Sequence, residues 1–130
     1  MVKLERSAPV LQVRDVEKST AFYTDKLGFT SANMWGEPPC FCIVGRETVT
    51  IFLDQQREDG PLPINQYWAA YVYVDDVDSY MADVQERGVE IIRGPENTDY
   101  GCREFDVRDP DGHIIGFGQD IAPSGRGPGL

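Results

Sequence analysis

Histidine and cysteine are scarce in this chain, which limits the metal and thiol chemistry open to it. There is one histidine, His113, among 130 residues, whereas a catalytic first-row metal normally needs about three protein ligands. Three cysteines, an odd number without a secretion signal, argue against a disulfide framework. Cys40 and Cys42 share one face of an expected strand, but two thiolates make an incomplete metal site. We expect the cysteines to be small buried hydrophobic residues.

Long apolar runs are absent. No segment approaches the roughly 18 apolar residues of a membrane span, and residues 1–6 contain no apolar region of a signal peptide. The sequence therefore predicts a cytoplasmic protein that has no membrane partner.

Positive charge is also in short supply. The chain has 12 basic against 22 acidic residues, a formal net charge of -10. Such a surface repels phosphate backbones, so we exclude nucleic acid as a partner and expect attraction for cationic ligands. The simpler interpretation, that the charge only keeps a soluble protein in solution, stays open.

The chain does contain enough apolar sequence for a core, and it contains one internal repeat. Hydrophobic residues make up 41% of the chain. In segments 13–29 and 74–89 an apolar stretch runs into Asp-Val, then into about three helical turns, and then into a glycine followed by strand-like residues. Two copies about 60 residues apart predict two similar modules in one small protein.

The pattern around each copy predicts a strand, a helix and three strands. Asp15 and Asp76 are suitable N-caps for the two helices, and Gly28 and Gly88 are suitable stops. The fold class is therefore α+β, with two tandem βαβββ modules that form a half-open sheet cleft, completed in a dimer. The expected strands are 8–14, 29–35, 40–45, 48–54, 67–74, 89–93, 103–108 and 113–119. One domain, 1–121, is expected to comprise module one at 1–54, a linker at 55–66 and module two at 67–121, followed by a flexible tail at 122–130.

Overlaying the two copies identifies the side chains expected to face the cleft. Aligning the Asp-Val pairs matches three residues of the first strand with three of the second: Ala8 with Ala69, Val10 with Tyr71, and Gln12 with Tyr73. The residues between them are apolar in both copies, which suits packing under each helix. We therefore expect the matched residues to face away from the helices.

The βαβββ repeat, the Val-x-Asp-Val…Phe-Tyr…Leu-Gly-Phe opening at 13–29 and the Asp-Pro-Asp-Gly-His turn at 109–113 resemble one known group of proteins. That group is the vicinal oxygen chelate superfamily, which includes glyoxalase I, extradiol dioxygenases, fosfomycin resistance enzymes and bleomycin resistance proteins. The resemblance covers roughly residues 8–119 and implies the two-module fold. Because this scaffold hosts many chemistries, the fold alone does not identify a function.

Enzymes of this superfamily bind a divalent metal through inward-facing strand positions, and here those positions lack donor side chains. By resemblance, they correspond to Ala8, Ala69 and Gly116, with a fourth position on the strand around 50–52. None of the residues at 50–52 is a usual ligand of a divalent metal. The resemblance therefore implies no metal, no cofactor and no catalytic residue, and we interpret His113 as a structural residue of its turn.

The metal-free bleomycin resistance proteins match best, through Ala-Pro-Val-Leu at 8–11, Phe-Tyr at 22–23 and Arg-Glu-Phe-x-Val-Arg-Asp-Pro at 103–110. Those proteins are acidic dimers that catalyse nothing and sequester a cationic glycopeptide antibiotic in two crevices at the subunit interface. In that family a proline matching Pro9 marks where the N-terminal arm crosses to the partner. The resemblance therefore implies a homodimer that exchanges residues 1–8, binds a cationic or aromatic small molecule, and confers antibiotic resistance.

The expected ligand site is aromatic, since stacking and cation–π attraction contribute roughly 0.5–2 kcal/mol per well-placed ring. The candidate ligand-binding residues are Tyr71, Tyr73, Trp35, Phe41, Trp68, Gln12 and Arg103, with Asp54, Glu37 and Asp99 as candidate counter-charges. The family's cleft tryptophan aligns with Tyr71, whereas alternation places Trp68 on the helix-facing side, so the stacking platform is altered. The alternatives are ordinary core packing of the rings, and pairing of Arg103 with Glu104 or Asp106.

Three functional interpretations stay open. The one we prefer is a non-catalytic protein that binds and sequesters a small molecule at a dimer interface. The second is a lyase or dioxygenase-like enzyme of the same superfamily with a non-standard or absent metal site. The third is a scaffold with no small ligand.

Overall fold

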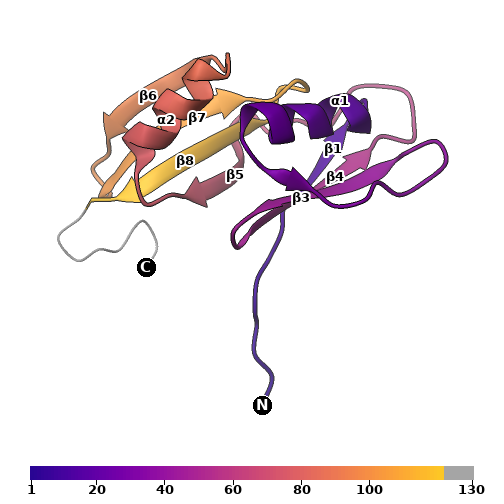
Figure 1. Cartoon of the computed structure of the whole chain (residues 1–130), viewed down its shortest axis with the longest axis horizontal. Coiled ribbons are helices and arrows are strands. Elements are labelled where there is room, and N and C mark those ends of the chain that lie inside the picture. Colours follow the sequence, from indigo (N-terminus) through magenta and orange to yellow (C-terminus); the bar gives the residue numbers. More distant parts are fainter. Residues whose placement is uncertain (122–130) are drawn as a thin grey trace. The chain divides into compact units, whose positions relative to one another are not determined.

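A computed structural model describes residues 1–121 of the chain, and the predicted flexible tail at 122–130 lies outside the described residues (Figure 1). The chain divides into two units, Met1–Pro63 and Ile64–Leu130. The division falls inside the segment 55–66, where we expected a linker. No helix of the described part is long and apolar enough to cross a membrane.

In the first unit, a helix covers one face of a four-stranded mixed sheet (Figure 1). The strands are β1 (Val10–Val13), β2 (Thr30–Ser31), β3 (Phe41–Arg46) and β4 (Val49–Gln55), in the order β1-β4-β3-β2. β1 is parallel to β4, and the other neighbouring strands are antiparallel. The helix α1 (Val16–Ala21) packs against β3 and β4 and continues as a π-helical turn, η1 (Phe22–Lys26).

The second unit repeats this plan. Its strands are β5 (Trp68–Tyr73), β6 (Ile91–Asn97), β7 (Cys102–Arg108) and β8 (Ile114–Asp120), in the order β5-β8-β7-β6, with β5 parallel to β8. The helix α2 (Val77–Glu86) packs against β6, β7 and β8. The matching strand orders confirm the predicted α+β fold of two tandem βαβββ modules.

Both helices begin in the same way. Asp15 and Asp76, the predicted caps, each accept hydrogen bonds from amides of the first helical turn. A second contact was not predicted. The side-chain oxygen of Gln55 accepts the amide of Val16 at 3.0 Å, and that of Gln119 accepts the first amide of α2 at 2.9 Å. The last strand of each module therefore fixes where its helix starts.

The core of each unit lies between the helix and the sheet. In the first unit it contains Leu11, Val13, Val16, Tyr23, Leu27, Val44, Ile51 and Leu53, and in the second Val77, Val84, Phe105, Val107, Ile115 and Phe117. Cys42 and Cys102 are buried, as predicted, and Cys40 is half-buried. Cys102 lies on the face of its sheet away from α2, where its thiol contacts Asp120.

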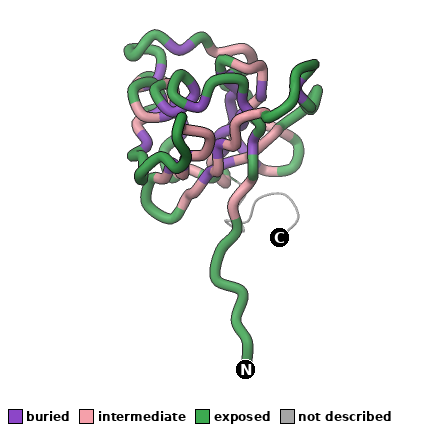
Figure 2. The backbone as a smooth tube through the Cα atoms, turned by 90° about the vertical axis from the view of Figure 1, so that its right-hand side faces the viewer, coloured by how far each residue is buried: buried purple, intermediate pink, exposed green. Residues whose placement is uncertain are grey.

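Two predicted strands of the first unit are shorter than expected. The segment 29–35 pairs only at Thr30–Ser31 and through one isolated bridge between Trp35 and Phe41, and Gly36 then turns the chain with a positive φ of 101°. β1 begins at Val10, directly after Pro9. Residues 1–7 are exposed and extend away from β1 (Figure 2).

Candidate functional site

The sheet of the second unit has a face turned away from α2, and its side chains follow the strand register. Tyr71 of β5 lies beside Gly116 of β8, which lies beside Asp106 of β7. In the next row Gly118 stands between Tyr73 and Glu104. The central strand of this face therefore carries no side chain at either position.

The two glycines make room for aromatic rings. A Cβ at Gly118 would lie 1.8 Å from the hydroxyl oxygen of Tyr71, and a Cβ at Gly116 would lie 2.6 Å from the indole nitrogen of Trp68. Both distances are far below van der Waals contact. The rings therefore lie directly over the bare backbone of β8.

Trp68 lies on the same side as Tyr71, so its predicted helix-facing position is wrong. The reason is a bulge, since the register between β5 and β8 slips between Trp68 and Ala70. The ring centroids of Trp68 and Tyr71 are 4.7 Å apart in an edge-to-face arrangement, and those of Tyr71 and Tyr73 are 5.2 Å apart. Three neighbouring rings therefore cover this face.

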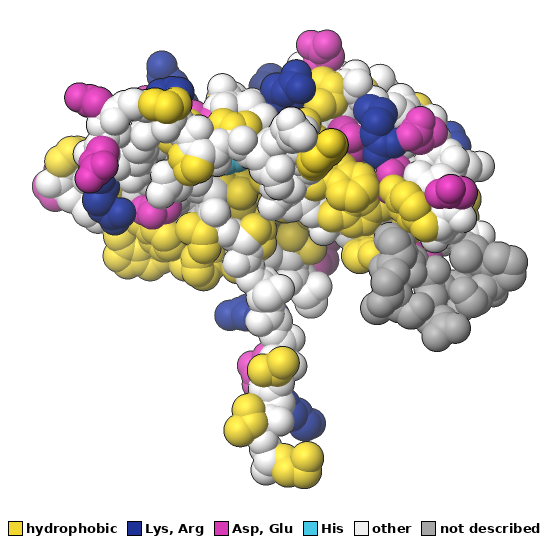
Figure 3. All heavy atoms as spheres, turned by 180° about the vertical axis from the view of Figure 1, so that it is seen from behind, with side chains coloured by type: hydrophobic (Ala, Val, Ile, Leu, Met, Phe, Trp, Pro, Cys, Tyr) yellow, Lys and Arg dark blue, Asp and Glu magenta, His cyan; other side chains and the backbone are white. Residues whose placement is uncertain are grey.

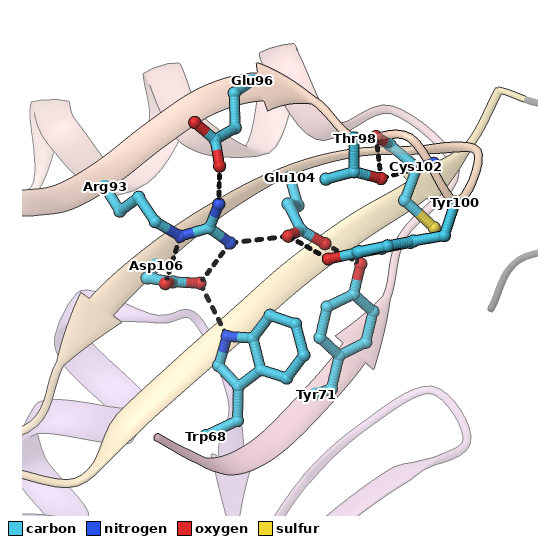
Figure 4. A network of polar contacts seen from close by, with 9 residues as sticks. All are labelled: Trp68, Tyr71, Arg93, Glu96, Thr98, Tyr100, Cys102, Glu104 and Asp106. Carbon is cyan, nitrogen blue, oxygen red and sulfur yellow. Dashed lines mark hydrogen bonds and ion pairs between the residues drawn. The ribbon is translucent and has the colours of Figure 1, made fainter. Parts of the chain in front are cut away.

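Two buried carboxylates accept hydrogen bonds from Trp68, from Tyr71 and from a further ring, Tyr100 (Figure 4). Glu104, whose side chain is 1% exposed, accepts hydrogen bonds from the hydroxyls of Tyr71 at 2.6 Å and Tyr100 at 2.5 Å. Asp106 accepts one from the indole nitrogen of Trp68 at 2.9 Å. The guanidinium of Arg93 joins the two carboxylates, donating to Glu104 at 2.6 Å and to Asp106 at 2.7 Å.

The network keeps each proton in place at neutral pH. Burial raises the pKa of Tyr71 above its usual range, and donation to Glu104 raises it further. Burial and the same carboxylate raise the pKa of Tyr100 to about 12. Burial also raises the pKa of Glu104, but hydrogen bonds from Tyr100, Tyr71 and Arg93 outweigh it and leave that pKa below its usual value. None of these three groups has a pKa shifted toward neutral pH, where acid–base catalysts operate.

A pocket of about 690 Å³ opens beside this network, within the second unit. Its volume lies in the range of small-molecule sites. The pocket is lined by three rings (Tyr67, Trp68 and Tyr100), four carboxylates (Glu96, Asp99, Glu104 and Asp106) and one guanidinium (Arg93). Because carboxylates outnumber the cation, the pocket attracts positive charge.

The other predicted site residues lie elsewhere. Trp35, Phe41 and Gln12 belong to the first unit, where the ring centroids of Trp35 and Phe41 are 5.7 Å apart. Tyr73 lies beside Tyr71 but does not line the pocket. Arg103 points to the helix side, where Nε donates to Asp78 at 3.0 Å. Its alternative pairing with Glu104 or Asp106 is therefore wrong, because both carboxylates pair with Arg93.

Sequence reasoning missed Arg93 and Glu96, the contact between Tyr100 and Glu104, and the roles of Glu104 and Asp106. A signal was present in β7, where Glu104 and Asp106 alternate with the apolar Phe105 and Val107. Alternation in a strand packed under a helix places such carboxylates on the opposite face, next to Tyr71. Arg93 and Tyr100 lie outside that strand, and no sequence pattern marks their contacts.

These features define a two-module α+β protein with an aromatic, acid-lined pocket on one open sheet. The chain belongs to the Glyoxalase/Bleomycin resistance protein/Dioxygenase superfamily, whose family model matches residues 7–117. No curated protein matches the chain.

Solved structures of an antibiotic binding protein and of a glyoxalase/bleomycin resistance protein are among those similar to the chain. TnmS3, an antibiotic binding protein from Streptomyces sp. CB03234, is 29% identical with a TM-score of 0.70, and the match covers 92% of this chain and 99% of that one. A glyoxalase/bleomycin resistance protein from the same Streptomyces is 31% identical, with a TM-score of 0.67 and coverage of 88% and 100%. TioX from Micromonospora sp. ML1 has a TM-score of 0.74 at 16% identity, covering 90% and 99%, and shows the shared fold alone.

The residues present do not fit the divalent metal site of the superfamily's enzymes. Ala8 and Ala69 offer no donor atom, and a carboxylate at position 116 would occupy the space of the Trp68 and Tyr71 rings. Within 1–121, no group of three or more His, Cys, Asp or Glu side chains is close enough together to hold a metal ion.

Proposed function

We propose that this chain is a non-catalytic protein that binds and sequesters a cationic aromatic small molecule of antibiotic type. The observation that carries the proposal is the pocket of the second unit, where three rings meet an excess of carboxylates. Rings supply stacking and cation–π attraction, and the carboxylates select positive charge. The similarity to TnmS3, an antibiotic binding protein, supports the same ligand class.

The hydrogen bonding of the site favours binding over catalysis. The hydroxyls of Tyr71 and Tyr100 are both committed to Glu104, and Arg93 is committed to three carboxylates. A general acid or base needs a free, correctly tuned group within reach of the substrate. Groups that satisfy one another instead form a fixed wall, which suits recognition of a ligand.

We propose further that the protein acts as a cytoplasmic homodimer that exchanges its N-terminal arm at Pro9. The open face of the first unit carries apolar side chains, including Val10, Phe41 and Phe52, and Figure 3 displays apolar side chains gathered along the side of this unit away from α1. A contiguous apolar surface of this kind is typical of an interaction site. The exposed arm carries Met1, Val2 and Leu4, which a partner subunit would cover. The free cysteines suit a reducing compartment.

Fluorescence titration tests the binding proposal, because the chain has two tryptophans in different units. In a Trp35→Phe variant, fluorescence excited at the long-wavelength edge of tryptophan absorption reports Trp68 alone. In a Trp68→Phe variant it reports Trp35 alone. We expect a bleomycin-type glycopeptide or a planar aromatic cation to quench Trp68 at micromolar concentration or below. The proposal would be overturned if the fluorescence of neither tryptophan changed up to millimolar ligand. It would also be overturned by stoichiometric Zn, Ni, Mn or Fe in protein purified without chelators.

A further inference from the structure

One cation already lies among the carboxylates of the pocket, the guanidinium of Arg93 (Figure 4). Its Nε donates to Asp106, its Nη2 donates to Glu104, and its Nη1 pairs with Glu96. The side chain lines the pocket and is 33% exposed. Arg93 therefore stands where the charged group of a cationic ligand would otherwise meet the buried carboxylates.

The four carboxylates of the pocket fall into two pairs. Glu104 and Asp106, which we call the floor carboxylates, have side chains only 1% and 9% exposed and accept hydrogen bonds from Arg93 and from the rings. Glu96 and Asp99, the rim carboxylates, are exposed. The floor pair is enclosed and its oxygens already accept hydrogen bonds from Arg93 and the rings, so the carboxylates that an incoming ligand can reach are those of the rim pair, although Glu96 is itself paired with Arg93.

We propose that Arg93 determines the charge selectivity and the orientation of the ligand in this pocket, an inference that rests on the proposed function. Arg93 repels a positive charge placed over the floor carboxylates, while Trp68 and Tyr100 offer ring surface to a neutral aromatic system. A ligand whose ammonium group extends from one end of its ring system can place that group at the exposed rim, beside Asp99 and Glu96, instead of over the guanidinium of Arg93. A ligand whose charge lies within the ring system meets Arg93 instead.

Three small probes on the full chain separate these cases. They are 1-naphthylmethylamine, whose ammonium lies outside the ring; 1-naphthalenemethanol, its neutral analogue; and N-methylquinolinium, whose charge lies in the ring. The indole N–H resonance of Trp68 in two-dimensional NMR reports occupancy of the pocket even at weak affinity, and that of Trp35 is the internal control. We expect the wild type to bind the ammonium probe tightest and the quinolinium weakest.

Substitution then tests Arg93 and each of the two rim carboxylates. Arg93→Gln should strengthen quinolinium binding about tenfold and leave the neutral alcohol unchanged. Glu96→Gln and Asp99→Asn should each weaken binding of the ammonium probe about threefold to tenfold, and binding of the alcohol should again not change. Glu90→Gln, an exposed position outside the pocket, makes the same charge change and should alter nothing.

The possible failures are distinguishable. If Arg93→Gln shifts all three affinities alike, or leaves quinolinium weakest, the role of Arg93 is overturned while the proposed function stands. If Arg93→Gln does not fold, unchanged ammonium affinity in both rim variants overturns the inference by itself. If no probe moves the Trp68 resonance of the wild type, the proposed function fails and the inference fails with it.

Discussion

In the first unit the residues Val10, Phe52 and Ile43 form a row across β1, β4 and β3, on the face away from the helix. At the same places in the second unit the row consists of Tyr71, Gly116 and Asp106. The next row repeats the contrast, with Gln12, Asp54 and Phe41 in the first unit and Tyr73, Gly118 and Glu104 in the second.

The central strand accounts for the difference. Phe52 on β4 fills its face with an apolar side chain, whereas Gly116 and Gly118 on β8 leave an open strip of backbone. Rings from β5 lie across that strip, and their polar atoms then reach the carboxylates of β7. One backbone plan thus gives an apolar face in one module and a hydrogen-bonded aromatic face in the other, and only the second borders the acidic pocket.

Adding a side chain to the bare backbone of β8 should have the largest effect on stability. In Gly118→Ala the new Cβ would lie 1.8 Å from the Tyr71 hydroxyl and 2.6 Å from its ring carbon Cζ. The Tyr71 ring must therefore move, and its hydroxyl loses the hydrogen bond to Glu104. We expect the free energy of unfolding to fall by about 3 kcal/mol, measured in urea.

The matched control is Gly45→Ala in the first unit, where the nearest atom to a new Cβ is the carbonyl oxygen of Val49 at 3.1 Å. We expect a smaller loss there. In a Tyr71→Ala background the cost of Gly118→Ala should nearly vanish, because the clash is gone. An equal loss of unfolding free energy in that background would show that the clash with Tyr71 is not the cause.

Removing the buried negative charge should have the next largest effect. Glu104→Gln weakens hydrogen bonds from Tyr71, Tyr100 and Arg93, so we expect a loss of about 2 kcal/mol near pH 7. Because the pKa of Glu104 is lowered in the folded protein, its ionisation stabilises the fold above the ordinary glutamate pKa. That contribution disappears as the pH falls through the lower, folded value.

Urea titrations from neutral pH down to about pH 3 test this sign. The stability difference between wild type and Glu104→Gln should shrink as the solution becomes acidic. Asp54→Asn is the first-unit comparison, since Asp54 has one ion pair, to Arg57 at 3.4 Å. It should change stability little at either pH. A Glu104 difference that grows in acid would contradict the lowered pKa.

The fold could be predicted because each level of the sequence pointed to the same elements. Asp15 and Asp76 mark helix starts, glycines mark the stops, and alternation marks the strands. The error at 29–35 came from treating strand-like residues as a continuously paired strand, whereas they pair only at Thr30–Ser31 and at Trp35. Pairing depends on what a neighbouring strand offers, which a local pattern does not contain.

The site was harder to predict from the sequence than the fold, because its geometry depends on non-local packing. Tyr71 and Tyr73 follow simple alternation, but a single bulge at 68–70 reverses the side on which Trp68 lies. No residue type in Trp-Ala-Ala announces that bulge. Arg93 comes from β6, and the two buried carboxylates with which it pairs come from β7, so these contacts depend on a register that itself slips twice.

The shared helix start offers a test in which the two units should agree. Gln55→Ala and Gln119→Ala each remove one hydrogen bond to the first amide of a helix, at 3.0 and 2.9 Å. We expect each to cost about 1 kcal/mol, with the two values similar. Urea unfolding followed by far-ultraviolet circular dichroism measures both. Clearly unequal costs would mean that the repeat conserves geometry at this contact without conserving its energy.

The smallest effect on stability, and the sharpest test of the apolar face, should come from Val10→Ser. Val10 is 58% exposed, so its loss should change the unfolding free energy by at most about 0.5 kcal/mol. If the open face of the first unit is the dimer surface, the same change removes apolar contact from the interface and raises the dimer dissociation constant several-fold in sedimentation equilibrium. Ile64→Ser, at an exposed apolar residue of the second unit, should leave association unchanged. Equal effects of both substitutions, or a monomeric wild type, would leave the apolar face without its proposed partner and confine function to the second unit.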